Sequence, residues 1–360
     1  MRGGAIVARA PVLDDAARTL RPFVRKYLGS KRLLRGWIAD RICQSAGVPE
    51  SFLDGFFGTG SISHEMALRG ARRISAVETL RSNCVILRGC CRAREEGSLA
   101  RLAVWMRRLN ELDPMRGYLT ESYADTYFTA ENCARMDAIR EEMERLVAAG
   151  EVTTADHEQL LASFLLEADR VANTLGQYDA FLKNPRGPSM VDGRHLVDGR
   201  VRSPFRLRPL APFPADGVDV IEGDLLQVAS RMQIDVAYFD PPYNTRQYCD
   251  NYHVLENLAR WEKPILRGKT RKFDRDGLKS PFSRRREAAG ALAALIAATR
   301  ARHLFLSYSS EGIVAAESIF ELLSRRGEVR VFEHTYPVFG NGAGVSRRRN
   351  VVEYLFHVRG

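Results

Sequence analysis

Short apolar runs and amphipathic stretches alternate in the first part of the chain. Residues 51–57, SFLDGFF, form an apolar run that predicts a strand, and GTGS at 58–61 predicts a turn. A short helix is expected over 62–70, closed by Gly70, and a second strand over 73–78, RISAVE. Strands that alternate with helices in this way predict a mostly parallel sheet with helices on both faces.

The same alternation returns after residue 217. Strands are predicted at 218–224, 234–240, 303–309, 329–337 and 351–358, and helices at 287–301 and 313–325. The segment 338–350, between the last two strands, is rich in glycine. These two strands therefore predict a hairpin that adds an antiparallel edge to the sheet.

Residues from about 101 to 216 follow a helical pattern instead. Apolar residues fall on one helical face at Met136, Ile139, Met143, Leu146 and Val147, and on another at Leu160, Leu161, Phe164, Leu165, Ala168, Val171, Ala172 and Leu175. Gly150 separates the two helices, and Thr153 and Asp156 have capping-box spacing at the start of the second. We expect an α/β domain of residues 1–100 and 217–360, interrupted by a mainly helical region at 101–216.

The end of that region has a different composition. Residues 184–214 are rich in Pro, Gly and Arg, and VDGR occurs twice, at 191–194 and 197–200. A repeat this short does not indicate a repeat architecture. It predicts a turn-forming loop or a small hairpin.

Composition adds a charge signal to this picture. The 360 residues include 54 Lys and Arg against 44 Asp and Glu, a formal net charge of +10. Such an excess favours a polyanionic partner, because each cation can neutralise a phosphate; the alternative is that it serves solubility alone. The six cysteines show no C-x-x-C spacing and no metal-ligand pattern with histidine. With no long apolar stretch, we expect a cytoplasmic protein with reduced thiols, no metal and no membrane span.

A glycine-rich turn follows the first predicted strand. Gly58 and Gly60 allow a ligand close to the backbone, just before a helix whose first N–H groups are unpaired. The turn matches neither G-x-x-x-x-G-K-[ST] nor G-x-G-x-x-G, which disfavours a phosphate cradle. Glu78 ends the next strand twenty residues after Gly58, where nucleoside-binding α/β folds place an acid on ribose hydroxyls. The alternative is a chance pairing.

The tetrapeptide at 240–243, DPPY, ends an apolar strand. An exocyclic base amine is a poor nucleophile because its lone pair is delocalised into the ring. Asp240 and the carbonyl of Pro241 could accept its two hydrogens and favour a pyramidal nitrogen, while Pro242 stiffens the turn. Tyr243 offers a face for base stacking. The alternative is an ordinary strand-ending turn.

Several motifs, in order, carry a resemblance to one enzyme family. They are KYLGSKRLL at 26–34, FLDGFFGTGS at 52–61, VET at 77–79, EGDLL at 222–226 and DPPYNTRQYCDNYHVLENLARW at 240–261. The chain resembles S-adenosylmethionine-dependent DNA adenine-N6 methyltransferases of the Dam-like alpha-order class, of the restriction-modification type. The resemblance spans most of the chain. Tyr27 stands where such lids usually have Trp, and Gly55 where a bulkier residue is frequent.

The resemblance implies a Rossmann-like methyltransferase fold with a mostly parallel seven-stranded sheet and S-adenosyl-L-methionine as cofactor. The residues it places in the cofactor pocket are Tyr27, Lys31, Asp54, Phe56, Gly58, Gly60, Glu78, Asp224 and Asp240. The catalytic residues it implies are Asp240, Pro241, Pro242 and Tyr243. The partner would be double-stranded DNA with the target adenine flipped out, and a cognate restriction endonuclease could act separately.

Basic stretches lie at 200–208, 267–287 and 346–349. Phosphate contact is expected from at least one of them, although a charge run is usually a solvated face. The residues predicted to contact DNA are Asn244, Arg246, Tyr248, Lys269, Arg271, Arg284, Arg285, Arg347 and Arg348. Residues 168–183 resemble a segment of the family's inserted target-recognition region that lies near DNA; the alternative is the packed end of the helical hairpin.

Two other functions are compatible with these motifs. DPPY also suits two other exocyclic amines, N2 of guanine in RNA and N4 of cytosine in DNA. A non-catalytic DNA-binding specificity protein is the other alternative, and the complete DPPY and glycine turn argue against it.

Overall fold

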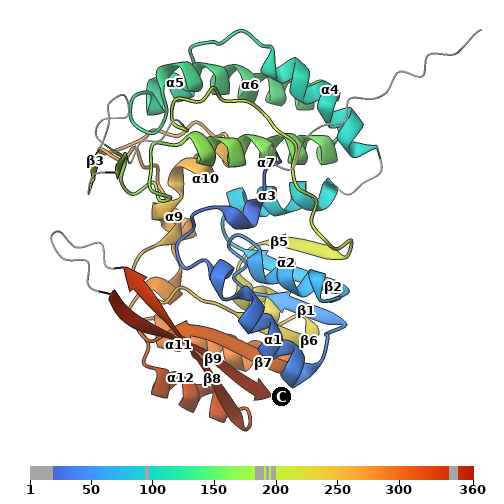
Figure 1. Cartoon of the computed structure of the whole chain (residues 1–360), viewed down its shortest axis with the longest axis vertical. Helices are drawn as coiled ribbons and strands as arrows, with labels where there is room; N and C mark the ends of the chain where they lie inside the picture. The colour runs from blue at the N-terminus through green and yellow to red at the C-terminus, as the bar shows by residue number, and fades with distance from the viewer. Residues whose placement is uncertain (1–18, 94–96, 183–189, 192–193, 196–199, 340–347) are drawn as a thin grey trace, which may run out of the picture.

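The computed structural model describes residues 19–93, 97–182, 190–191, 194–195, 200–339 and 348–360. A seven-stranded sheet has the order β5-β2-β1-β6-β7-β9-β8 (Figure 1). Its strands are β1 Ser51–Asp54, β2 Arg73–Glu78, β5 Val218–Glu222, β6 Gln233–Phe239, β7 Arg300–Ser309, β8 Val329–Phe339 and β9 Arg348–Arg359. The first five in the order are parallel, and β9 is antiparallel to both neighbours. The predicted mixed sheet with a terminal hairpin is confirmed.

Side-chain alternation along the central strands builds two cores, one on each face of the sheet. Phe52 and Val236 join the core on one face, while their neighbours Leu53 and Ala237 join the core on the other. Helices α1 Arg35–Ala46, α2 Ser61–Leu68 and α3 Arg81–Arg92 cover the first face, and α8 Leu225–Ala229, α11 Ala288–Ala298 and α12 Ala316–Ser324 the second. Strands buried on both faces explain the nearly continuous apolar runs of the sequence.

Two predicted helices are shorter than expected. The helix expected over 287–301 ends at Ala298, and the prediction for residues 300 and 301 is wrong, because both already pair with β6 in the sheet. The helix expected from 313 begins at Ala316, since the Ile313 amide instead donates to the carbonyl of Tyr243 at 2.9 Å.

The predicted helical hairpin is confirmed. It consists of α6 Ala130–Ala148 and α7 Thr154–Val171, and the Thr153 hydroxyl accepts the amide of Asp156 at 3.0 Å, as the capping pattern predicts. The shorter helices α4 Ser98–Asn110 and α5 Tyr118–Tyr123 accompany it at one end of the molecule (Figure 1). Helix α7 packs on α3 so closely that a Cβ at Gly89 would lie 2.4 Å from the Cβ of Ala162.

The remaining helices follow the DPPY segment: α9 Tyr248–Asn251 and α10 His253–Arg260. The 3-10 turns are η1 Pro22–Val24, η2 Lys31–Leu33, η3 Asp276–Leu278 and η4 Pro281–Ser283. Met190–Val191 (β3) pairs antiparallel with Arg194–His195 (β4) at the first VDGR copy, where a turn-forming loop or a small hairpin was predicted; residues 197–199 of the second copy lie outside the described residues. No helix in the described part of the chain has the length and apolar character needed to cross a bilayer.

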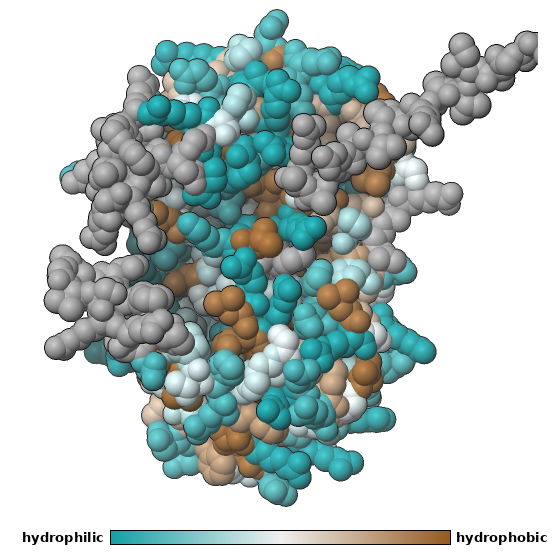
Figure 2. Space-filling view, viewed as in Figure 1, coloured by the Kyte–Doolittle hydropathy of each residue, from teal (hydrophilic) through white to brown (hydrophobic). Residues whose placement is uncertain are grey.

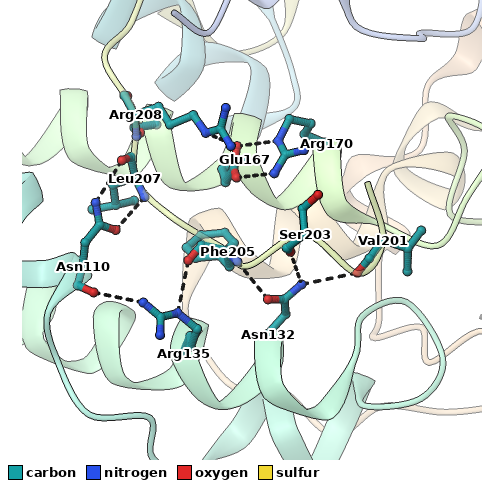
Figure 3. Close-up of polar contacts among 11 residues, drawn as sticks. Asn110, Asn132, Arg135, Glu167, Arg170, Val201, Ser203, Phe205, Leu207 and Arg208 are labelled. Carbon is teal, nitrogen blue, oxygen red and sulfur yellow. Dashed lines mark hydrogen bonds and ion pairs between the residues drawn. The ribbon is translucent and has the colours of Figure 1, made fainter. Parts of the chain in front are cut away.

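An extended strap at 201–208 crosses α6 and α7, held by side-chain amides (Figure 3). Asn132 accepts the amide of Phe205 at 2.8 Å and donates to the carbonyl of Ser203 at 3.0 Å. Asn110 bonds both the amide and the carbonyl of Leu207. Each amide side chain therefore supplies the donor and acceptor that a neighbouring strand would otherwise provide.

Asn132→Ala is expected to lower the free energy of unfolding by about 2–3 kcal/mol, because it leaves buried backbone groups of the strap without partners. Urea denaturation measures the change. Glu131→Ala, at the exposed neighbouring position, is the control and should shift stability far less. Equal effects of the two substitutions would contradict the role of Asn132.

Candidate active site

The carboxyl ends of the parallel strands β1, β2 and β6 meet at a cavity of about 270 Å³. Of the residues predicted for the site, Tyr27, Lys31, Asp54, Phe56, Gly58, Glu78, Asp224, Asp240, Pro242 and Tyr248 line this cavity. Gly60, Pro241 and Tyr243 adjoin lining residues without lining it themselves. Such a place outside the carboxyl ends of the strands is where open α/β sheets bind ligands.

Asp54 ends β1 at the floor of the cavity and is 1% exposed. Its Oδ2 accepts hydrogen bonds from the amide and the hydroxyl of Ser63, at 3.2 and 2.6 Å. Its Oδ1 is buried and has no hydrogen-bond partner among the described residues. Burial raises the pKa of Asp54 to about 7, although the hydrogen bonds from Ser63 act to lower it. The free oxygen is an acceptor available to a ligand.

Glu78 ends β2, and its carboxylate is anchored by the turn that follows. Its Oε1 accepts the amides of Thr79 and Leu80 at 2.8 and 3.3 Å. Asn83, in the first turn of α3, donates to Oε2 at 3.4 Å and to the Tyr27 hydroxyl at 3.0 Å. Burial raises the pKa of Glu78 above its usual value. The sequence analysis did not identify Asn83, although its position in the first turn after a strand-ending acid is a usable signal.

The predicted lid at 26–34 is held over the cavity by tyrosines that follow DPPY. The ring of Tyr27 stacks on that of Tyr252, with centroids 4.4 Å apart. The amide of Leu28 donates to the Tyr252 hydroxyl at 2.7 Å, and the Tyr248 hydroxyl donates to the Leu28 carbonyl at 3.1 Å. Gly29 has a φ of +71°, and a Cβ there would lie 2.8 Å from the Tyr248 hydroxyl. The lid is therefore fixed to the same segment that carries DPPY.

Asp240 follows β6 and forms a buried ion pair with the lid. Its Oδ1 accepts a hydrogen bond from Lys31 Nζ at 2.6 Å. Burial raises the pKa of Asp240 to about 6, and the ammonium of Lys31 opposes that rise. The pKa of Lys31 is itself raised, because the two carboxylates beside it outweigh its burial. Lys31 was predicted as a cofactor residue; it lines the cavity, and its ammonium contacts Asp240.

The other residues of DPPY are buried or are held by contacts with residues outside the tetrapeptide. Pro241 and Pro242 are buried, and the Tyr243 carbonyl accepts the amide of Ile313. The Tyr243 ring meets the Tyr308 ring edge-on, with the two centroids 6.4 Å apart. Lys31 Nζ lies 5.4 Å from the centroid of the Tyr243 ring. The loop before α12 thus holds the backbone of Tyr243, and Tyr308 of β7 packs against its half-buried ring.

The predicted DNA contacts are scattered in the structure. Asn244 accepts the amide of Arg246 in a local turn, and the Arg246 guanidinium reaches Gln177 at 3.3 Å. Lys269, Arg271, Arg284 and Arg285 are exposed, and Arg284 forms an ion pair with Glu287. Arg347 lies outside the described residues, and Arg348 begins β9. The contact of Tyr248 with DNA stays a prediction, since the structure shows it in the cavity wall beneath the lid.

The segment 168–183 combines buried and exposed residues. Asn173 and Tyr178 are fully buried, and the Tyr178 hydroxyl donates to Asp169 at 2.9 Å. These residues form the packed end of the helical hairpin, the alternative that the sequence left open. Two of its residues contact the segment that begins with DPPY: Gln177 accepts Arg246, and the Tyr178 amide donates to the carbonyl of Asn251 at 2.7 Å.

The face in view in Figure 2 is mostly hydrophilic, with hydrophobic side chains in small separate groups. Within the described residues, no three His, Cys, Asp or Glu side chains gather as metal ligands would. One wall of the cavity was not predicted from sequence: residues 277–282, which belong to η3, η4 and the link between them. Nothing in their composition distinguishes them from a surface loop, because only the fold brings them to the strand ends.

A sheet of this order, with acids at the ends of two adjacent strands and DPPY at the end of a third, fits a methyltransferase of the α/β class, with the ligand site outside the strand ends. The chain belongs to the D12 class N6 adenine-specific DNA methyltransferases, whose family model matches residues 27–321. The predicted family is therefore confirmed, and with it the enzyme class.

The alignments with three curated relatives cover most of the chain. Type II methyltransferase M.CviAII of Paramecium bursaria Chlorella virus 1 is 31% identical over 92% of this chain and 97% of that protein. Type II methyltransferase M.NlaIII of Neisseria lactamica is 29% identical over 87% of this chain and 92% of its own length. Modification methylase StsI of Streptococcus sanguinis is 28% identical over 93% of this chain, which spans 52% of that relative.

Asp54→Asn is expected to change how stability depends on pH. Because the folded pKa of Asp54 is raised to about 7, its contribution is fully present below the unfolded pKa near 4 and is lost as pH rises through 7. The unfolding free energy of the wild type relative to Asp54→Asn should fall by roughly 1.4 kcal/mol per pH unit between those values. Urea titrations at several pH values test this, with exposed Asp219→Asn as control. A difference independent of pH would contradict the assignment.

Proposed function

We propose that the chain transfers a methyl group from S-adenosyl-L-methionine to N6 of an adenine flipped out of double-stranded DNA. The observation that supports this most strongly is Asp240, 16% exposed and paired with buried Lys31, at the wall of the cavity that Asp54 and Glu78 also line. An acceptor for the target amine and acceptors for a nucleoside-like cofactor thus share one enclosed space.

The lining residues fit the chemistry of the cofactor. When bound, S-adenosyl-L-methionine supplies an electrophilic methyl group on a cationic sulfur. Glu78 is placed for ribose hydroxyls, and the free Oδ1 of Asp54 is an acceptor for a donor group. Phe56 and Phe282, edge to face with centroids 5.0 Å apart, give an apolar surface for a purine ring. Asp224, which caps α8 through Oδ1, lies at the same wall.

Asp240 performs the central step of the proposed mechanism. Lys31 occupies its Oδ1, which leaves Oδ2 to accept one hydrogen of the target amine, while the Pro241 carbonyl accepts the other. The lone pair of the nitrogen would then point away from both acceptors. Methylation makes that nitrogen cationic, and it must lose a proton. A carboxylate with a pKa raised to about 6 is a suitable base near neutral pH.

The region at 101–216 is proposed as the target-recognition part, and residues 1–100 with 217–360 as the catalytic part. Support comes from the exposed cations at 267–286 and from Arg246, which links the DPPY segment to Gln177 at the end of the helical hairpin. Since M.CviAII and M.NlaIII are type II methyltransferases, we further propose a role in a restriction-modification system with a separate endonuclease.

Asp240→Asn is expected to lower kcat for methyl transfer to duplex DNA at least about a hundredfold, because the amide is a weaker acceptor and cannot take the proton. Transfer of labelled methyl measures this, with exposed Asp219→Asn as control. Transfer to ribosomal RNA or to cytosine, and none to adenine, would overturn the proposed substrate. Cofactor binding without any transfer would support the non-catalytic alternative.

Gly58→Val is expected to weaken cofactor binding at least about tenfold, which corresponds to about 1.4 kcal/mol. Gly58 has a φ of +53°, and a Cβ there would lie 3.0 Å from the Tyr27 ring, so a branched side chain displaces the lid. Calorimetric titration measures the affinity. Gly150→Val serves as control: it introduces similar backbone strain at a φ of +67°, but the added Cβ has no atom within 4 Å. Equal losses in both variants would exclude a local effect of Gly58.

A further inference from the structure

A second buried carboxylate lies behind the catalytic one. Glu353, on β9, is 1% exposed. Its Oε1 accepts the hydroxyl of Ser307, on β7, at 2.5 Å and lies 3.3 Å from Lys31 Nζ. Burial of a carboxylate is costly unless it is paired and hydrogen-bonded, and the antiparallel strand brings this one to the Lys31–Asp240 pair.

The ammonium of Lys31 is saturated by this arrangement. It has three hydrogens, and three acceptors surround it: Asp240 Oδ1 at 2.6 Å, Glu353 Oε1 at 3.3 Å and the carbonyl of Gly29 at 3.4 Å. Lys31 is itself only 5% exposed. A cation held on three sides cannot rotate away from Asp240. Its position therefore selects the carboxylate oxygen that remains free.

We propose that Glu353 is a positioning residue for methyl transfer: acting through Lys31, it fixes the orientation of Asp240 and sets the charge of the cluster. This inference rests on the proposed function of the same site. Lys31 alone could neutralise Asp240, so Glu353 adds a net negative charge that favours a cationic species in the cavity. Both the methyl donor and the newly methylated amine are cationic.

The two neighbours of Asp240 act on it in opposite directions. The negative charge of Glu353 raises the pKa of Asp240, and the positive charge of Lys31 lowers it. The other titratable groups that face this cluster are Tyr238 on β6, Tyr243 after it, Tyr248 on α9, Tyr336 on β8 and Asp54 on β1. The pKa values of the four tyrosines are all raised, so these side chains stay neutral near pH 7. Asp54, whose pKa burial raises to about 7, is partly ionised near neutral pH and adds to the charges of Glu353 and Lys31 around Asp240.

The test measures the pKa of Asp240 directly and through activity. Full-length protein carrying ¹³C-labelled aspartate carboxyls is titrated by NMR, with Asp240→Asn identifying the resonance. Glu353→Gln should lower the pKa of Asp240 by about one unit, and Lys31→Met should raise it. The acid limb of kcat for DNA methylation should move in the same direction in Glu353→Gln. Glu333→Gln, at an exposed position on the adjacent β8, is the matched control and should move neither.

An unchanged pKa of Asp240 in Glu353→Gln would overturn the inference, whatever the activity. If the wild type methylates no DNA, the proposed function fails, and the NMR titration still decides whether Glu353 acts on Asp240. Should Glu353→Gln not fold, Glu353→Asp keeps the charge on a shorter side chain that no longer reaches Lys31. It should lower kcat several-fold at the plateau and leave KM for DNA unchanged; an unchanged kcat would refute the positioning role.

Discussion

The ion pair between Lys31 and Asp240 joins two segments 209 residues apart in the chain, and the architecture of the site depends on it. Lys31 belongs to the lid and Asp240 to the end of a central strand. Placing two charges out of water is favourable only when their partners are fixed, so both segments must be held rigidly. The sheet holds one, and Tyr248 of α9 and Tyr252, between α9 and α10, hold the other. The cavity between them is a consequence of that pairing.

Helix α3 connects the cavity to the region proposed for target recognition. Asn83 contacts Glu78 and Tyr27 on the cavity side, and its side-chain oxygen accepts Arg25 Nη1 at 3.2 Å. Arg25 in turn donates to Asp169 of α7 at 3.1 Å. A continuous set of hydrogen bonds thus runs from Glu78 to the helical hairpin. Arrangements of this kind provide a physical route by which occupancy of one site can bias the other.

Local sequence predicted the parts of the site that lie at strand ends. Asp54, Glu78 and DPPY each follow an apolar run, and the parallel arrangement brings such ends together. Helix boundaries were less predictable. Residues 300 and 301 continue an alanine-rich helical pattern, yet pairing with β6 draws them into the sheet. Glu353 was beyond reach because a glutamate on a hairpin strand looks like a solvent-exposed residue until the register places it against Lys31 and Ser307. Such contacts depend on topology, which spacing alone does not encode.

The contact between Gly89 and Ala162 limits how this protein can be rebuilt. At Gly89 the two helices meet with no room for a further side chain, so the surface there is shaped jointly by α3 and α7. New specificity is commonly sought by grafting a recognition segment from one enzyme onto the body of another. Here such a graft would have to include α3, which also carries Asn83, so the chimaera would inherit a residue of the donor's proposed cofactor pocket along with the proposed recognition segment.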